Sequence, residues 1–188
     1  TQYWEPQFSP KRNIPYIDAL EETKSTIKSS VERRLISERP IGSFLSGGID
    51  STIITAYMNQ LSSKQVHTFS IGFHENEFNE ANHAREVAEF LGTNHHEEII
   101  KPRSALLVEE IARILDQPFA DSSIIPTYLL SKFAKKELVV ALTGDGGDEI
   151  FGGYDRYVGA PLLQFLNPFN SSISLIMHFF NMKKLGRN

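Results

Sequence analysis

The chain has 188 residues, of which 40% are hydrophobic and 22% are charged, and its formal net charge is −4. This length suits one full domain, the composition is that of an ordinary soluble protein, and the negative charge argues against a nucleic-acid surface. No apolar run approaches the ~20 residues of a membrane span, and no signal-like segment opens the chain, so we expect a cytoplasmic protein. The absence of cysteine excludes a thiol nucleophile, a thiolate metal site and disulfides.

Residues 1–37 predict an extended arm followed by a helix. Prolines and aromatic rings are interspersed at the beginning of this segment, which favours an arm that packs by its rings. From Ile17 to about Ser37, apolar residues recur near helical spacing, and Pro40 then ends the helix.

Strands and helices alternate after the arm. The segments that predict strands are 41–45, 66–73, 95–101 and 138–142, and those that predict helices are 53–61, 80–91, 106–115 and 124–136. The run 138–142 is fully apolar, as in buried parallel strands. This order predicts right-handed crossovers and an open parallel α/β sheet with helices on both faces. The loops 46–51, 70–73 and 143–149 should then converge on one crevice at the carboxyl ends of the strands.

The loop Ser46-Gly47-Gly48-Ile49-Asp50-Ser51 follows the first predicted strand and opens a helix. Glycines there allow an anion to approach the backbone, and the hydroxyls of Ser46 and Ser51 are further donors, so the loop predicts a phosphate site. A carboxylate such as Asp50 beside polyphosphate indicates a magnesium-bound nucleotide. The lysine of an ordinary P-loop is absent. A plain Gly-Gly turn is the alternative for this segment alone.

A second glycine-rich segment, Thr143-Gly144-Asp145-Gly146-Gly147-Asp148-Glu149, follows the last predicted strand. Its acids would lie where a metal-bound nucleotide binds, and Asp50 and Asp148 could share one magnesium ion. The segment lacks the ligand spacing of an EF-hand calcium loop. A solvated acidic turn is the alternative reading.

Several sequence blocks resemble known families. The form SGGIDS resembles the PP-loop of the ATP pyrophosphatases, and GDGGDEIFGGY closely resembles the synthetase domain of glutamine-dependent asparagine synthetases. RPIGSFLSGGIDS, HTFSIGF, FLGTNHHE and DQPFADSSIIPTYLLS are similar to that family in the same order, from about Tyr3 to Tyr157. The resemblance implies an adenine-nucleotide α-hydrolase-like fold with the nucleotide-binding core at 38–160. Residues 161–188 would then be the start of a C-terminal helical section that is truncated here.

The resemblance also implies a reaction. ATP would activate aspartate as β-aspartyl-AMP with release of pyrophosphate, and ammonia from an N-terminal glutaminase domain of the full-length protein would then give asparagine and AMP. By motif position, the adenosine would be bordered by Leu45, Ile71, Thr143 and Gly144, the pyrophosphate would be held by Ser46, Gly47, Gly48, Asp50 and Ser51, and magnesium would be bound by Asp50 and Asp148.

Asp145 departs from the family, which often carries a glutamate at this position. Its side chain is one methylene shorter, which changes its reach by about 1.5 Å. A role as the base of the ammonia step and a purely structural role both stay open. Two alternatives to the whole reading also stay open: a related PP-loop amidotransferase that acts on a sugar acid or a β-lactam precursor, and an inactive ATP-binding fragment. A homodimer is compatible with the sequence.

Other polar residues are assigned structural roles. His95 and His96 are consecutive on a predicted strand, so their side chains should point to opposite faces of the sheet. His67, His74, His83 and His178 are isolated in the sequence, which favours surface or interface positions over a role as ligands. The segment Asp121-Ser122-Ser123 precedes a predicted helix and should cap it; the resemblance adds that it borders the aspartate pocket.

Overall fold

The computed structural model describes residues 1–7, 9–73, 80–100, 104–117 and 119–155, together with Tyr157 and Gly159. The chain forms two compact units, Thr1–Gly144 and Asp145–Asn188. The predicted helical section at 161–188 and His74 lie outside the described residues. None of the described helices is long and apolar enough to cross a membrane.

The first unit contains a four-stranded parallel sheet in the order β3-β2-β1-β4. The strands are β1 (Ile41–Phe44), β2 (His67–Phe73), β3 (Asn94–Ile100) and β4 (Val140–Leu142). The helices are α1 (Tyr16–Arg34), α2 (Ile49–Leu61), α3 (Ala81–Leu91), α4 (Ser104–Ile114) and α5 (Ile124–Ala134). The parallel sheet predicted from the alternating elements is therefore confirmed, and its strands bring the loops after β1 and β4 to the same edge.

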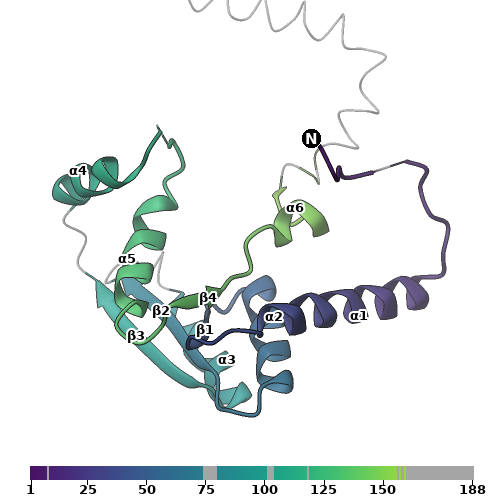
Figure 1. Cartoon of the computed structure of the whole chain (residues 1–188), viewed down its shortest axis with the longest axis horizontal. Coiled ribbons are helices and arrows are strands. Elements are labelled where there is room, and N and C mark those ends of the chain that lie inside the picture. The colour runs from purple at the N-terminus through teal and green to yellow at the C-terminus, as the bar shows by residue number, and fades with distance from the viewer. Residues whose placement is uncertain are drawn as a thin grey trace, which may run out of the picture. The chain divides into compact units, whose positions relative to one another are not determined.

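Helices cover both faces of this sheet, as predicted (Figure 1). On one face, Val31 of α1, Met58 of α2 and Val66 form a buried cluster. On the other face, Phe69 of β2 packs against Ala134 of α5. Because successive side chains of a strand point to opposite faces, the sheet contributes side chains to both cores.

The C-terminal strand differs from its prediction. β4 begins only at Val140 and pairs on one side, with β1, within the described sheet. Leu138 is buried against α5, but Val139 is 61% exposed. The prediction of a fully buried strand over 138–142 was wrong, because this apolar run is divided between the α5 core and a sheet edge. Helix α1 also ends before its predicted limit, with Leu35 as its C-cap.

The paired histidines of β3 point to opposite faces, as predicted. Nδ1 of His95 lies 2.9 Å from Oγ1 of Thr68, and its Nε2 lies 3.1 Å from Oγ of Ser70. Thr68 and Ser70 are buried residues of β2. His95 thus links two strands on the α3 face of the sheet.

His96 lies on the other face, where its ring stacks on Phe69 with 4.6 Å between ring centroids. Its Nε2 lies 3.0 Å from Nδ1 of His67. His67, which was predicted to lie at the surface or an interface, is half-buried beside the neighbouring strand β3. Parallel pairing places β2 beside β3, so residues far apart in sequence become neighbours.

Burial lowers the pKa of His95 from its ordinary value of 6.5, and the nearby carboxylate of Glu97 opposes this effect only in part. Below about pH 6.5 the unfolded chain takes up a proton that the folded chain still excludes, so the free energy of unfolding should fall with falling pH. In H95Q this contribution should disappear. Urea unfolding followed by circular dichroism between pH 5 and pH 8 measures it.

The matched control is H83Q, which changes an exposed histidine of α3. If H95Q keeps the wild-type pH dependence, or if H83Q loses the same amount, burial of His95 is not the cause.

Candidate functional site

Leu45 fixes the start of the predicted phosphate loop. It follows β1 directly and is 1% exposed, and its side chain packs against Ala84 and Ala88 of α3. Its N–H donates a 2.9 Å hydrogen bond to the carbonyl oxygen of Phe69. The chain is therefore held by the sheet and by α3 up to the residue at which the loop begins.

The loop is braced by its own hydroxyl groups. The Oγ atoms of Ser46 and Ser51 lie 3.0 Å apart, and the N–H of Gly48 donates to Oγ of Ser46 over 3.2 Å. Oγ of Ser51 in turn donates to the carbonyl oxygen of Gly48 over 3.2 Å. In the structure these hydroxyls hydrogen-bond within the loop, and their predicted donation to phosphate stays a prediction.

The loop leads into the positive end of α2. The N–H groups in the first turn of a helix have no intrahelical acceptor, and Gly48, the N-cap residue, brings no side chain to cap them. Such a helix end binds anions. Asp50 lies in this first turn and is half-buried.

Gly47 lies against the N-terminal part of α3. Its φ is +86°, and a Cβ atom there would lie 2.6 Å from the carbonyl carbon of His83 and 2.7 Å from the nitrogen of Ala84. Both are backbone atoms, so they have little freedom to yield. The sequence did not predict that His83 lies beside the loop, because no spacing pattern connects the two.

The segment after β4 approaches the same loop. A Cβ atom on Gly144 would lie 2.6 Å from the nitrogen of Ser51 and 2.9 Å from Cβ of Asp50. Thr143, which precedes it, is half-buried. Ile71, the remaining residue expected to border adenosine, lies on β2 and is also half-buried. The structure therefore brings Gly144 together with Asp50 and Ser51, whereas the roles of these residues stay predictions.

The acidic segment belongs to the second unit, in which Gly147–Phe151 form helix α6. Gly146 is its N-cap with a φ of +89°, Asp145 is exposed, and Asp148 lies in the first turn. A Cβ atom on Gly153 would overlap the Asp148 carboxylate at 1.9 Å. That glycine thus makes the room that the carboxylate occupies.

The predicted magnesium ligands Asp50 and Asp148 lie in different units, and their pairing stays a prediction. Among the described residues, no group of three or more histidine, aspartate or glutamate side chains is arranged to hold a metal ion. A magnesium ion held by two protein carboxylates, with phosphate and water as its other ligands, would not form such a group.

The loop before α5 is shaped by Asp121. Its carboxylate accepts a 2.9 Å hydrogen bond from the N–H of Ser123, which lowers the pKa of Asp121. Ser123 is the N-cap residue and α5 has no side-chain capping bond, so the predicted cap is absent and Asp121 instead forms a turn before the helix. Asp121 also lines a pocket of about 630 Å³ between α4 and α5, together with apolar residues and Asp116.

Comparison with known proteins places these features in context. The family model described as "Asparagine synthase" matches residues 22–183. The chain is 35% identical over 185 residues to the "Putative asparagine synthetase (glutamine-hydrolyzing) 2" of Methanocaldococcus jannaschii, covering 97% of this chain and 35% of that protein. It is 40% identical over 141 residues to "Asparagine synthetase (glutamine-hydrolyzing) 1" of Bacillus subtilis, covering 73% of this chain and 22% of that protein.

The chain thus spans about a third or less of the length of these curated relatives. Among solved structures, it is similar to an NH3-dependent NAD synthetase from Campylobacter jejuni, with a TM-score of 0.48 and 16% sequence identity. That similarity covers 71% of this chain and 60% of the other.

The close approach of Gly47 to α3 leads to a stability prediction. In G47A, alanine would have to adopt the left-handed backbone of Gly47, and its Cβ would also overlap the backbone of α3. The free energy of unfolding should therefore fall by clearly more than the left-handed backbone alone would cost. Gly92 is the matched control, because its φ is +69° and nothing lies within 4 Å of a Cβ there. G92A should lose about 1 kcal/mol. Urea unfolding of both variants measures the difference, and equal losses would show that α3 yields to the new methyl group.

Proposed function

Because the chain belongs to the asparagine synthase family, we propose that it is the part of an ATP-dependent amide ligase that activates a carboxylate and transfers ammonia to it. The observation that carries the proposal is the braced loop 46–51, which opens onto the positive end of α2 and lies against Gly144. The proposed substrate is aspartate, as the names of the relatives suggest.

The proposed reaction has two steps. A side-chain carboxylate oxygen of aspartate attacks the α-phosphorus of ATP, and the bond to the β-phosphate breaks, so pyrophosphate leaves and β-aspartyl-AMP forms. Ammonia then attacks the acyl carbon and loses a proton, AMP leaves, and asparagine forms. Such chemistry needs positioning and charge neutralisation more than covalent help from the protein. A loop already held by internal hydrogen bonds and by neighbouring backbone can supply that positioning.

We assign the pyrophosphate to the loop residues Ser46 to Ser51, and the adenosine to the surroundings of Leu45, Ile71, Thr143 and Gly144. Support comes from the first-turn N–H groups of α2, which point along the helix axis to where an anion would bind. The close fit of Gly144 against Asp50 and Ser51 supports a role for the segment after β4.

We assign the magnesium ion to Asp50 and Asp148. Both side chains are carboxylates, which Mg²⁺ prefers as ligands, and they lie in the first turns of α2 and α6. When bound, magnesium would neutralise charge on the departing pyrophosphate. Asp145 is the proposed base of the ammonia step; it lies in the same unit as Asp148, at the turn before α6.

The ammonia would come from a glutaminase domain in the full-length protein, since the relatives are named glutamine-hydrolyzing. One competing reading is an ATP-binding fragment without turnover. A related amidotransferase with another carboxylate substrate is the other competing reading.

Pyrophosphate release tests the proposed function. The chain is incubated with ATP, magnesium, ammonium and aspartate, and pyrophosphate, AMP and asparagine are measured. We expect aspartate-dependent formation of all three products. Binding of ATP without turnover would identify a fragment, and turnover only with a sugar acid or a β-lactam precursor would change the assigned substrate.

Removal of the Asp50 carboxylate tests the magnesium assignment. D50N should lower magnesium-dependent pyrophosphate release by about 100-fold, because charge on the leaving group would lose a neutralising contact. Its unfolding transition should remain close to wild type, since a half-buried carboxylate at a helix start contributes little to the core. The matched control is D18N, which removes an acid from the first turn of α1. Full activity in D50N would refute the assignment.

A further inference from the structure

Helix α3 is seated closely on the sheet by small side chains. Ala81, Ala84 and Ala88 are each at most 1% exposed. Ala84 and Ala88 pack against Leu45, the residue before the phosphate loop. Alanine side chains bring a helix near its support, but they interlock little with the surface below. A polar contact to the sheet would fix the position of α3 along its axis, as the 2.7 Å hydrogen bond from Nδ2 of Asn59 to the carbonyl oxygen of Leu91 does towards α2.

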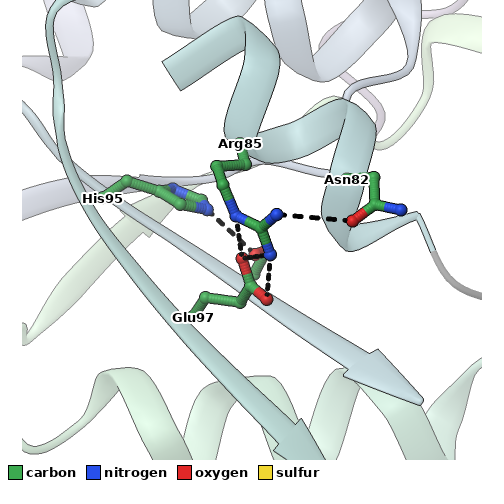
Figure 2. A network of polar contacts seen from close by, with 5 residues as sticks. Asn82, Arg85, His95 and Glu97 are labelled. Carbon is green, nitrogen blue, oxygen red and sulfur yellow. Dashed lines mark hydrogen bonds and ion pairs between the residues drawn. The ribbon is translucent and has the colours of Figure 1, made fainter. Parts of the chain in front are cut away.

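An ion pair between Arg85 and Glu97 supplies that contact (Figure 2). Nη2 of Arg85 lies 2.8 and 2.9 Å from the two carboxylate oxygens of Glu97, and its Nε donates over 3.1 Å. Nη1 also reaches the side-chain oxygen of Asn82, at 3.4 Å. The side chain of Glu97 is 17% exposed and that of Arg85 is 50% exposed. A fork of this geometry restricts direction as well as distance.

The ion pair acts on the part of α3 that touches the loop. Arg85 follows Ala84 directly, and the backbone of His83 and Ala84 occupies the space where Gly47 would carry a Cβ. Glu97 is a residue of β3, so one end of the connection is anchored in the sheet. Contacts thus connect β3, through Glu97 and Arg85, with the part of α3 that lies against the predicted phosphate loop.

We propose that Arg85 and Glu97 are positioning residues for the nucleotide loop, and this inference rests on the function proposed above. Neither residue contacts the nucleotide in this proposal. Their ion pair holds α3 where its backbone sets the shape of the loop at Gly47. Surface ion pairs contribute little to folding, whereas a binding loop that is no longer held in its bound shape binds its ligand more weakly. The effect should therefore fall on nucleotide use more than on stability.

The test compares variants in the pyrophosphate-release assay with ATP as the varied substrate. R85A and E97Q should each raise KM for ATP about tenfold, with a smaller change in kcat and an unfolding midpoint close to wild type. The exchanged pair R85E/E97R should recover much of the lost affinity, because it restores opposite charges between α3 and β3. The matched control is R113A, which removes another arginine–glutamate pair, with Glu109 on α4, and should leave KM unchanged.

The outcomes separate this inference from the proposed function. If the wild-type chain neither binds ATP nor releases pyrophosphate, the proposed function fails and this inference fails with it. If the wild-type chain is active and R85A and E97Q keep its KM for ATP, the inference alone is wrong. A general loss of folding in R85A, with no recovery in the exchanged pair, would assign the ion pair to stability and would also overturn the inference.

Discussion

The close approach of α3 to Gly47 is the constraint on which the phosphate loop depends. The left-handed backbone of Gly47 places its missing Cβ against backbone atoms of His83 and Ala84, and Gly144 meets the first turn of α2 in a similar way. Backbone atoms cannot rotate aside as the ends of side chains do. The loop is therefore held between two segments distant in sequence, and its shape follows from how each of them is seated on the sheet.

The sheet face below α2 and α3 is unusually polar for a buried surface. Ser43, Thr68 and Ser70 are at most 3% exposed. Each hydroxyl has a partner on another element: Ser43 bonds Thr55 of α2 at 2.8 Å, and His95 reaches both other hydroxyls. Buried polar groups are costly unless they are paired, so each pair specifies one relative position of two elements. These contacts join α2 to β1 and β3 to β2, whereas α3 is joined to β3 by the ion pair of Arg85 with Glu97.

Local sequence signals were sufficient for the parallel sheet and for the position of the loop, but they could not supply the strand order or individual contacts between distant segments. The alternation of β-rich and helical segments predicted the parallel sheet, and the glycine-rich segments after two strands predicted that loops 46–51 and 143–149 would converge. The apolar pattern at 138–142 could not show that Val139 would be exposed, because an edge strand and a central strand can share one composition. The proximity of His83 to the loop depends on the packing of α3 against Leu45 and Gly47, which no local sequence signal supplies.

In the function proposed above, the charge balance at the start of α2 favours a nucleotide that arrives with a cation. A helix N-terminus favours a nearby anion by about 0.3–1 kcal/mol. Two like unit charges 4 Å apart repel by about 4 kcal/mol at an effective dielectric constant of about 20. The helix end therefore cannot hold both the Asp50 carboxylate and a polyphosphate by its dipole alone. A divalent ion between the two anions replaces their repulsion with attraction of each anion to the metal, so the same carboxylate that would repel a bare polyphosphate selects its metal complex. The hydrogen bonds of Ser46 and Ser51 keep the loop in one shape before binding, and the cost of ordering it is met during folding.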